Sequence, residues 1–407
     1  MAAPLAGLRV LDLSRVLAGP WCGQIFADLG AEVIKIERPG RGDDTREWGP
    51  PWLKDKDGTE THESAYFLSA NRGKRSVTVD ITKDAGRDLV RDLARMSDIL
   101  IENYKVGDLD AKGLGYADMA KVNPGIIYCS ISGFGQTGPR AKEPGYDYLA
   151  QGMGGFMSIT GVADGEPGAG PQRAGLAVAD LTTGMYSVIG ILAALRHRDA
   201  TGRGQRLDMA LLDTQVGWLA NQAQNYFTSG QMPVRTGSWH PNLAPYQPFK
   251  TGDGYVIMAV GNDLQFERLC NFIGRPELVR DVRFATNPAR VAHRIALAEE
   301  IEAVMVTHAS AHWLAVLPKA GVPCGAVNTI DKVFEEPQVI ERGMKVMMDH
   351  PKGGAIPTVA LPIKFSESTV DYALPPPLLG EHTDDVLSRL LKMDAAAIAR
   401  LRASGAI

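Results

Sequence analysis

Apolar positions in the first 200 residues alternate between the spacing of strands and the spacing of helices. Short apolar runs predict strands at residues 8–13 and 33–36, and apolar residues recur at helical spacing between Trp21 and Leu29. Residues 77–81 alternate as a strand does. This alternation of strand and helix patterns indicates a parallel sheet with helices packed on both of its faces.

The same pattern continues up to a long apolar helix. The further elements expected here are a helix over residues 84–96, strands over 99–101 and 126–131, and a long helix from Asp180 to Arg198. Gly202 and Gly204 follow that helix, where glycine commonly ends helices. The predicted fold of this part is α/β, a Rossmann-like open parallel sheet.

The later chain predicts a second, smaller α+β domain. Residues 230–248 are rich in Pro, Gly and Asn and indicate a loop or linker. The elements expected after it are a strand over 255–260 and helices over 264–273, 291–306 and 384–391. The chain between Pro323 and the last of these helices is expected to be irregular.

Composition narrows the class of protein. The chain has 407 residues, is 45% hydrophobic and carries a formal charge of -4, so we expect neither nucleic acid nor an acidic membrane as a partner. Its four cysteines form no CxxC pair, which favours a reducing compartment. We see no signal peptide and no uninterrupted apolar run of about 18 residues, and therefore expect a cytoplasmic protein.

Two motifs are typical of functions that the surrounding sequence does not favour. Residues 133–138 spell G-x-G-x-x-G after a predicted strand, but Pro139 and Pro144 interrupt the helix that a dinucleotide-binding loop should open. A glycine-rich turn is the favoured interpretation, with a nucleotide-dependent oxidoreductase as the alternative. His308 and His312 are one helical turn apart, but no third ligand accompanies them, and no metal is expected.

Basic residues follow several predicted strands. Ligands of open parallel sheets bind at the carboxyl ends of the strands, so these side chains could converge on a ligand that carries several phosphates. The set is Arg38, Arg41, Arg72, Lys74, Arg75, Lys105, Arg140 and Lys142.

Asp180 stands at the start of the long apolar helix. One interpretation makes it the helix N-cap. The other makes it a nucleophile, an ionised carboxylate held by helix-terminal N–H groups and able to attack an activated acyl group. The pattern by itself favours the cap and leaves both open.

The sequence resembles the class III CoA-transferases, the CaiB/BaiF-like family that includes formyl-CoA transferase and carnitine CoA-transferase. The resemblance covers essentially the whole chain. It is carried by LDLSRVLAGP (11–20), DLGAEVIKIE (28–37), ENY (102–104), TGRGQ (201–205), GVPCG (321–325) and LLGEHT (378–383).

The resemblance implies roles for individual residues. It makes Asp180 the catalytic nucleophile and places Tyr146 beside the active site as a substrate-binding residue. The residues expected to bind CoA are Val16, Arg38, Asn103, Tyr104 and Lys105. Coenzyme A is a substrate, and no further cofactor or metal is implied.

Two departures from the family pattern are visible. Relatives such as formyl-CoA transferase have glutamine where this chain has Leu17, and a CoA-binding arginine of those relatives is matched by Ala111, next to Lys112. The glycine-rich lid loop of formyl-CoA transferase is also missing, so formyl and oxalyl groups are not the expected substrates.

The α-methylacyl-CoA racemases of the same fold are an alternative. They use a histidine as a second proton-transfer group, where this chain has Tyr146-Asp147. Because tyrosine is a poor replacement for histidine near neutral pH, a transferase is favoured. Within that class the sequence is most similar to the succinyl-CoA:glutarate CoA-transferases, which implies a donor such as succinyl-CoA and an acceptor such as glutarate.

The mechanism implied passes through an aspartyl anhydride and an aspartyl-CoA thioester. Backbone N–H groups of residues 152–155 are candidates to stabilise the oxyanions. Arg15, Arg46 and Arg173 are candidates to hold the distal carboxylate of a dicarboxylic acid.

The family fold also implies an interlocked homodimer and a division into domains. The large CoA-binding α/β domain would comprise residues 1–195 and 325–407, and the small α+β domain residues 220–315. Linkers would lie at residues 196–219 and 316–324.

Overall fold

The computed structural model describes residues 2–407 and divides them into two compact units. Unit 1 contains the residues up to Phe156 together with Arg173–Ser229 and Ile340–Ile407. Unit 2 contains Met157–Gln172 and Gly230–Val339. Each unit has its own hydrophobic core and is described by itself.

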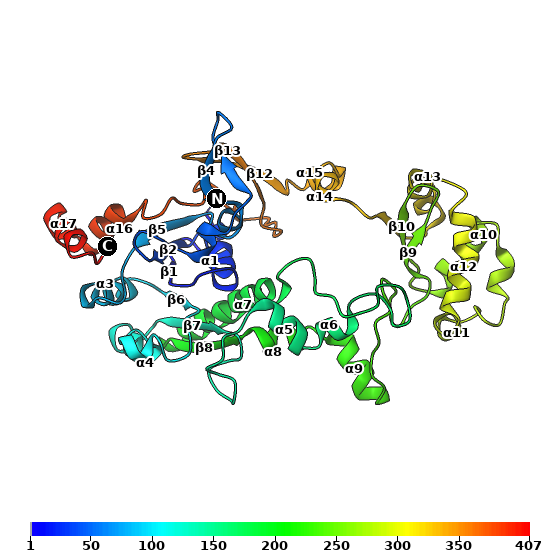
Figure 1. The fold of residues 1–407 in the computed structure, drawn as a ribbon, viewed down its shortest axis with the longest axis horizontal. Helices are drawn as coiled ribbons and strands as arrows, with labels where there is room; N and C mark the ends of the chain where they lie inside the picture. The colour runs from blue at the N-terminus through cyan, green and yellow to red at the C-terminus, as the bar shows by residue number, and fades with distance from the viewer. Residues whose placement is uncertain (1) are drawn as a thin grey trace. The chain divides into compact units, whose positions relative to one another are not determined.

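A six-stranded sheet in the order β5-β2-β1-β6-β7-β8 forms the centre of unit 1 (Figure 1). Every neighbouring pair in it is parallel. The strands are β1 (Arg9–Asp12), β2 (Glu32–Glu37), β5 (Lys74–Thr78), β6 (Ile99–Glu102), β7 (Ile127–Ser132) and β8 (Gln205–Ala210). The predicted open parallel sheet is thereby confirmed.

Helices cover both faces because successive strand residues point to opposite sides. In β1, Val10 packs with α1 (Ala18–Asp28) and α7 (Val178–Thr201), whereas Leu11 faces the opposite core. That opposite core is closed by the helices α3 (Asp84–Arg95), α4 (Tyr116–Val122), α16 (Thr383–Leu391) and α17 (Ala395–Ala403). The C-terminal helices therefore complete the fold that the N-terminal half begins.

The helix α7 is long and apolar enough to pass a length-and-composition test for a membrane span. Half of its most apolar stretch is buried within the protein, where it packs against α1 and the sheet. Such burial is the property of a core helix. Gly202, in the left-handed region with φ of 72°, ends the helix as predicted.

The remaining elements of unit 1 are short, and two of them, α6 and α15, lie across the boundaries between units 1 and 2 in the chain. They are η1 (Asp44–Glu47), β3 (Trp52–Lys54), β4 (Glu60–Ser64), α2 (Ala65–Ala70), η2 (Asp110–Lys112), α5 (Asp147–Met153), α8 (Leu211–Gly217), α9 (Ala220–Ser229), α15 (Pro337–Glu341), the antiparallel pair β12 (Lys345–His350) and β13 (Gly354–Val359), and α6 (Phe156–Ile159).

Unit 2 is a small α+β fold, as predicted. Its antiparallel sheet has the order β11-β10-β9. The strands are β9 (Tyr246–Lys250), β10 (Tyr255–Ala259) and β11 (Cys324–Ala326), and the helices are α10 (Asp263–Phe272), η3 (Pro276–Val279), α11 (Asn287–Ala292), α12 (Arg294–Met305), α13 (Ser310–Val316), η4 (Pro318–Ala320) and α14 (Ile330–Val333).

Three expectations about local structure were wrong. The chain after Pro323 is not irregular, since it forms β11 and the hairpin β12–β13, whose strands pair along six residue positions. The helix expected over 291–306 is two helices that meet at His293. The strand expected over 77–81 is β5, which begins earlier, at Lys74. The sequence did not indicate this start, because a lysine looks like a surface residue, whereas the ammonium group of Lys74 is paired with Asp12 inside the fold.

Candidate active site

Two adjoining cavities lie at the carboxyl ends of the central strands of unit 1. The strand order reverses between β1 and β6, because β2 and β5 follow on one side of β1 and β6 returns on the other. Ligands of open α/β sheets bind at such a switch point. Both cavities share Arg15, Arg41, Asp44 and Tyr104, so together they form one continuous depression.

The first cavity has a small excess of basic side chains, because its lining contains Arg15, Lys35, Arg38, Arg41 and Lys112 as well as Glu37, Asp43, Asp44 and Asp80. Arg38, Arg41 and Lys112 line it beyond the end of β2, together with the segment Val79–Thr82 after β5. Of the two neighbours Ala111 and Lys112, only the lysine lines the cavity. Cations gathered in this way suit a phosphorylated ligand.

The second cavity contains Asp180. It is lined by five of the six residues to which the sequence resemblance gives binding roles, and the sixth, Arg38, lines the first cavity instead. The five are Val16, Asn103, Tyr104, Lys105 and Tyr146. Residues far apart in the sequence are thus brought to one place, as the prediction requires.

Asp180 is the third residue of α7 and not its N-cap, which is Ala177. The amides of this helix end are occupied by Asp147, the first residue of α5: its Oδ1 accepts from Ala179 N at 2.8 Å and from Asp180 N at 3.2 Å. The cap interpretation of Asp180 is therefore wrong. So is the expectation that helix-terminal N–H groups hold its carboxylate ionised, because a second carboxylate takes those groups.

The surroundings of Asp180 disfavour its charge. Burial, with a smaller contribution from the negative charge of Asp147, raises the pKa of Asp180 to about 7. Tyr66 on α2 lies within the influence of the same charges, and burial together with Asp180 and Asp147 raises the pKa of its phenol to about 12. At neutral pH Asp180 is therefore divided between its protonated and ionised forms, and Tyr66 remains a hydrogen-bond donor.

Asn103 joins the two loops of the switch point. Its Oδ1 accepts from Arg15 N at 2.9 Å, and its Nδ2 donates to Arg15 O at 2.7 Å. The guanidinium of Arg15 also lies over the ring of Tyr104, 5.3 Å from its centroid. The family motif around Asn103 therefore fixes the backbone of the loop that follows β1.

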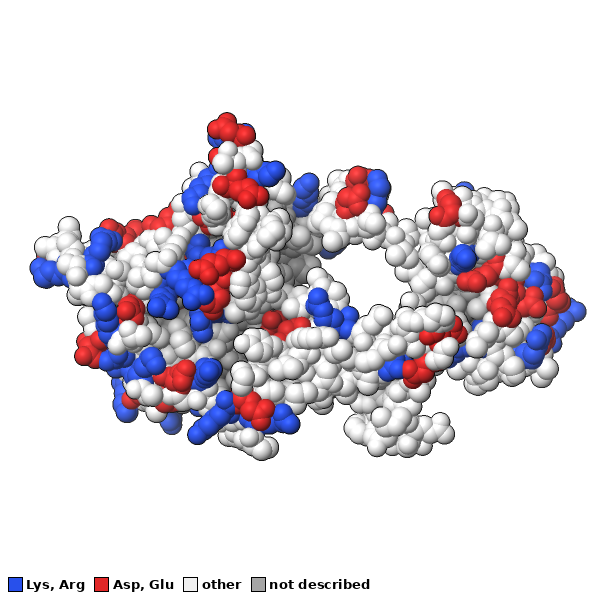
Figure 2. Space-filling model, viewed as in Figure 1, with Lys and Arg blue, Asp and Glu red and all other residues white. Residues whose placement is uncertain are grey.

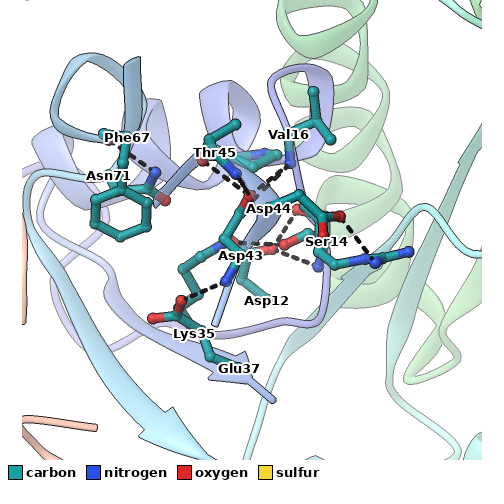
Figure 3. Close-up of polar contacts among 12 residues, drawn as sticks. Asp12, Ser14, Val16, Lys35, Glu37, Asp43, Asp44, Thr45, Phe67 and Asn71 are labelled. Carbon is teal, nitrogen blue, oxygen red and sulfur yellow. Dashed lines mark hydrogen bonds and ion pairs between the residues drawn. The ribbon is translucent and has the colours of Figure 1, made fainter. Parts of the chain in front are cut away.

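A buried ionic network supports this loop (Figure 3). Lys74 pairs with Asp12 at 3.0 Å and Lys35 pairs with Asp43 at 2.9 Å, and all four side chains are fully buried. Arg46 binds both carboxylate oxygens of Glu37, at 2.8 and 2.7 Å. Charges that are buried at such a cost are normally paired in this way.

Several expected cations are removed from the site by these pairs. Arg46 is committed to Glu37, Arg72 to Asp28 and Lys74 to Asp12. Arg173 lines neither cavity. Among the three candidates for a distal carboxylate, only Arg15 lines the cavity of Asp180. Its guanidinium also pairs there with the partly exposed carboxylate of Asp44, at 3.1 Å.

The expected oxyanion segment, residues 152–155, does not line that cavity either. The amides of Gly154 and Gly155 donate to the carbonyls of Ala150 and Gly152. The expectation is wrong because the segment is the C-terminal end of α5, where the backbone amides donate to carbonyls of the same helix.

The glycine motif at residues 133–138 forms a turn, as favoured. No helix opens there, and the next helix, α5, begins at Asp147. Gly133 instead allows a close approach of two backbones, since a Cβ at this position would lie 2.3 Å from the Cα of Gly145. His308 and His312 stack with ring centroids 4.2 Å apart, and no group of three potential metal ligands occurs among residues 2–407.

Sequence reasoning missed Trp48, Tyr66 and Asp43. Trp48 lines the cavity of Asp180 and contacts Tyr66 edge-on, with ring centroids 5.0 Å apart. All three lie in short irregular segments or a short helix between strands, where periodicity carries no signal. The only available signal was their position between β2 and β5, after the carboxyl end of a central strand.

The comparisons with known proteins agree with this geometry. The model of CoA-transferase family III matches residues 5–383, so the chain belongs to CoA-transferase family III and is a class III CoA-transferase.

Particular relatives cover nearly the whole chain. It is 49% identical to a succinate–glutarate CoA-transferase of Agrobacterium fabrum over 97% of both chains, and 44% identical to a succinyl-CoA:glutarate CoA-transferase of Mus musculus over 99% of this chain and 90% of that protein. The crystal structure of a CaiB/BaiF family protein from Brucella suis is 49% identical, covers 96% of this chain and matches it with a TM-score of 0.85.

Proposed function

We propose that this enzyme transfers CoA from succinyl-CoA to glutarate, with Asp180 as the nucleophile. One observation carries the proposal: the carboxylate of Asp180 lies in a cavity with the five expected binding residues, at the switch point of the sheet and next to a basic cavity. The two acids are suggested by the relatives that share 42–49% of the sequence.

The paired cavities suit the two ends of an acyl-CoA. The phosphates of CoA would lie against Arg38, Arg41 and Lys112. Lys112 would supply the charge that relatives carry on an arginine at the place matched by Ala111. The pantetheine arm would pass Tyr104, which lines both cavities, and bring the thioester to Asp180 beside Val16 and Asn103. Lys105 and Tyr146 line the same end.

The reaction then proceeds as four acyl exchanges. Asp180 attacks the thioester carbonyl, which forms a mixed anhydride and releases CoA thiolate. The thiolate attacks the aspartyl carbonyl, which frees succinate and leaves an aspartyl-CoA thioester. Glutarate attacks that thioester to give a second anhydride and thiolate, and the thiolate takes the glutaryl group, which restores the carboxylate of Asp180.

A dicarboxylate acceptor needs a cation for its distal carboxylate. Arg15, Lys105 and Lys142 line the cavity of Asp180, and we propose that this group supplies it. The pair Tyr146-Asp147 stands at the place of the racemase histidine, and the carboxylate of Asp147 is engaged by the amides of α7. It is a poor second proton-transfer group, which favours acyl transfer over racemisation.

We further propose that the enzyme is an interlocked homodimer whose two domains are units 1 and 2. The strand β8 lies within the linker expected over 196–219 but belongs to the central sheet of unit 1. An apolar face of α7 supports a partner: Met185, Tyr186, Ile189 and Leu192 are between 38% and 61% exposed. Val216 and Trp218 of the following segment are exposed as well. Exposed apolar surface of this extent commonly marks a protein interface.

The test is acyl exchange by purified protein incubated with succinyl-CoA and glutarate, followed by mass spectrometry. Wild type should form glutaryl-CoA, Asp180→Ala should lose this activity by at least about a thousandfold, and added hydroxylamine should convert Asp180 of the wild type to its hydroxamate. Asp199→Asn, an exposed aspartate near the other end of α7, is the matched control and should behave as wild type.

Each outcome has a distinct meaning. Exchange with other acids but not glutarate would change only the substrate. Undiminished exchange by Asp180→Ala would show that Asp180 is not the nucleophile. A lack of exchange by wild type across a panel of dicarboxylic acids would refute the proposed reaction.

A further inference from the structure

Val16 has an unusual backbone conformation. Its φ is 72°, in the left-handed region that β-branched residues avoid because their side chains clash with the backbone. Such a conformation is strained and persists only where the surroundings enforce it. Val16 lines the cavity of Asp180, so the strain lies at the proposed site.

The backbone here is held from two sides. Asn103 binds both the N–H and the carbonyl of Arg15. The next amide, of Val16, donates to both carboxylate oxygens of Asp43, at 3.2 and 3.3 Å. The conformation of residues 15 and 16 therefore depends on one side chain from the loop after β6 and one from the loop after β2.

Asp43 is itself fixed by buried partners (Figure 3). Lys35 Nζ donates to it at 2.9 Å, and Thr45 donates from its amide at 3.0 Å and from its hydroxyl at 2.8 Å. Lys35 Nζ also donates to the carbonyl of Ser14, at 2.8 Å, so a single ammonium group connects Asp43 to the loop that Asp43 orients.

The pair is ionised at neutral pH. Burial opposes the charge of Lys35, but the carboxylates of Asp43, Asp12 and Glu37 raise the pKa of Lys35 overall. Burial likewise opposes the charge of Asp43, and Lys35 and Thr45 lower the pKa of Asp43 overall. An ionised acceptor makes a stronger hydrogen bond to the Val16 amide than a neutral one would.

We propose that Asp43 and Lys35 are positioning residues of the transfer reaction, which hold Val16 in its left-handed conformation and thereby place the loop after β1 against the bound acyl-CoA. The inference rests on the proposed function only for the identity of the ligand. Leu17 and Ala18, the next residues, also line the cavity of Asp180, so a change at Val16 would displace the start of α1 there as well.

The alternative is that the pair only stabilises the fold, and a rescue experiment separates the two roles. Asp43→Asn removes the charge and one of the two acceptor oxygens, so the Val16 amide is held more weakly. Glycine adopts positive φ at no steric cost, so Val16→Gly should let the loop take its conformation without Asp43. Lys74→Met is the matched control, because Lys74 belongs to an equally buried pair but does not contact Val16.

The measurements are the dissociation constant for CoA by titration calorimetry, the steady-state constants for succinyl-CoA, and the melting temperature. Asp43→Asn should weaken CoA binding and lower kcat/KM by about tenfold or more, as the loss of one strong hydrogen bond does. Val16→Gly combined with Asp43→Asn should recover at least about threefold of that loss without restoring the melting temperature. The same glycine should not rescue Lys74→Met.

Equal rescue of both variants, or of neither, would overturn the positioning role. Thr45→Val is the milder variant if Asp43→Asn does not fold, since it removes one hydrogen bond to Asp43. A loss of CoA affinity should accompany it, and unchanged affinity would count against the proposal. Because CoA binding needs no acyl exchange, this readout stands even if the proposed substrates are wrong.

Discussion

At the scale of single residues, the site is dominated by two carboxylates. Asp147 and Asp180 are 33 positions apart in the sequence, yet Asp147 binds the amide of Asp180. This arrangement anchors the first turn of α7 and places a like charge near the proposed nucleophile. A carboxylate with a raised pKa is more basic and so a stronger nucleophile once ionised, but it is ionised in a smaller fraction of molecules.

The ionised fraction of Asp180 predicts how the rate of transfer depends on pH. Only ionised Asp180 attacks, and its pKa is raised to about 7 by burial and by Asp147, so kcat/KM for succinyl-CoA should rise with pH and level off above about 7. Asp147→Asn removes the like charge, so the pKa of Asp180 should fall and the rising limb should move to lower pH. Rates measured between pH 5.5 and 8.5 would show this, with Asp199→Asn as control.

An unmoved limb in Asp147→Asn would mean that burial alone sets the pKa of Asp180. A limb moved to higher pH would contradict the assignment of Asp180 as the titrating group.

At the scale of elements, the contact of α1 with α7 sets where Asp180 lies. Gly184, one turn after Asp180, faces the start of α1: a Cβ there would be 2.7 Å from the carbonyl oxygen of Ala18 and 3.2 Å from the ring of Trp21. The two helices can approach only because this position has no side chain. This close approach brings Ala18 of α1 near α7, and Ala18 lines the cavity of Asp180.

Gly184→Ala should therefore separate the helices. We expect a loss of about 1–3 kcal/mol in the free energy of unfolding, the usual cost of overpacking, together with a lower kcat. Gly190→Ala is the matched control in the same helix, because its Cβ would meet only the end of the Leu207 side chain. Alanine there should be neutral or stabilising by up to about 1 kcal/mol. Chemical denaturation would measure both, and equal effects would contradict the packing argument.

At the scale of the whole molecule, charge and apolar surface are distributed differently. Lys and Arg are interspersed with Asp and Glu over the face of unit 1 in Figure 2, which agrees with the small net charge of -4. A run of exposed apolar side chains lies on α7, around Ile189, which is 61% exposed.

Ile189→Arg should weaken the proposed homodimer, because a charge buried in an apolar interface without a partner is costly. Sedimentation velocity over a range of concentrations should show dimer for wild type and monomer for the variant. Val282→Arg, at an apolar position that is 84% exposed in unit 2, serves as control. A wild-type monomer, or a variant that remains dimeric, would refute the proposed interface.

The sequence alone determined the architecture of the sheet and the neighbourhood of the site. Apolar periodicity predicted β1, β2, β6, β7 and the helices α1, α3 and α7, because burial of one helix face or of both strand faces leaves a pattern that needs no knowledge of partners. The family motifs predicted that Val16, Asn103 and Tyr104 would meet Asp180 in one place, and they line one cavity.

Tertiary structure alone decided how each charge is used. Nothing in the sequence distinguishes Arg46, which is committed to Glu37, from Arg15, which lines the cavity of Asp180. Nor does it indicate that Asp147 caps the helix of Asp180 or that Asp43 holds Val16. The physical reason is that periodicity records how apolar each position is, whereas the fate of a charge depends on which partner the fold brings within hydrogen-bond distance.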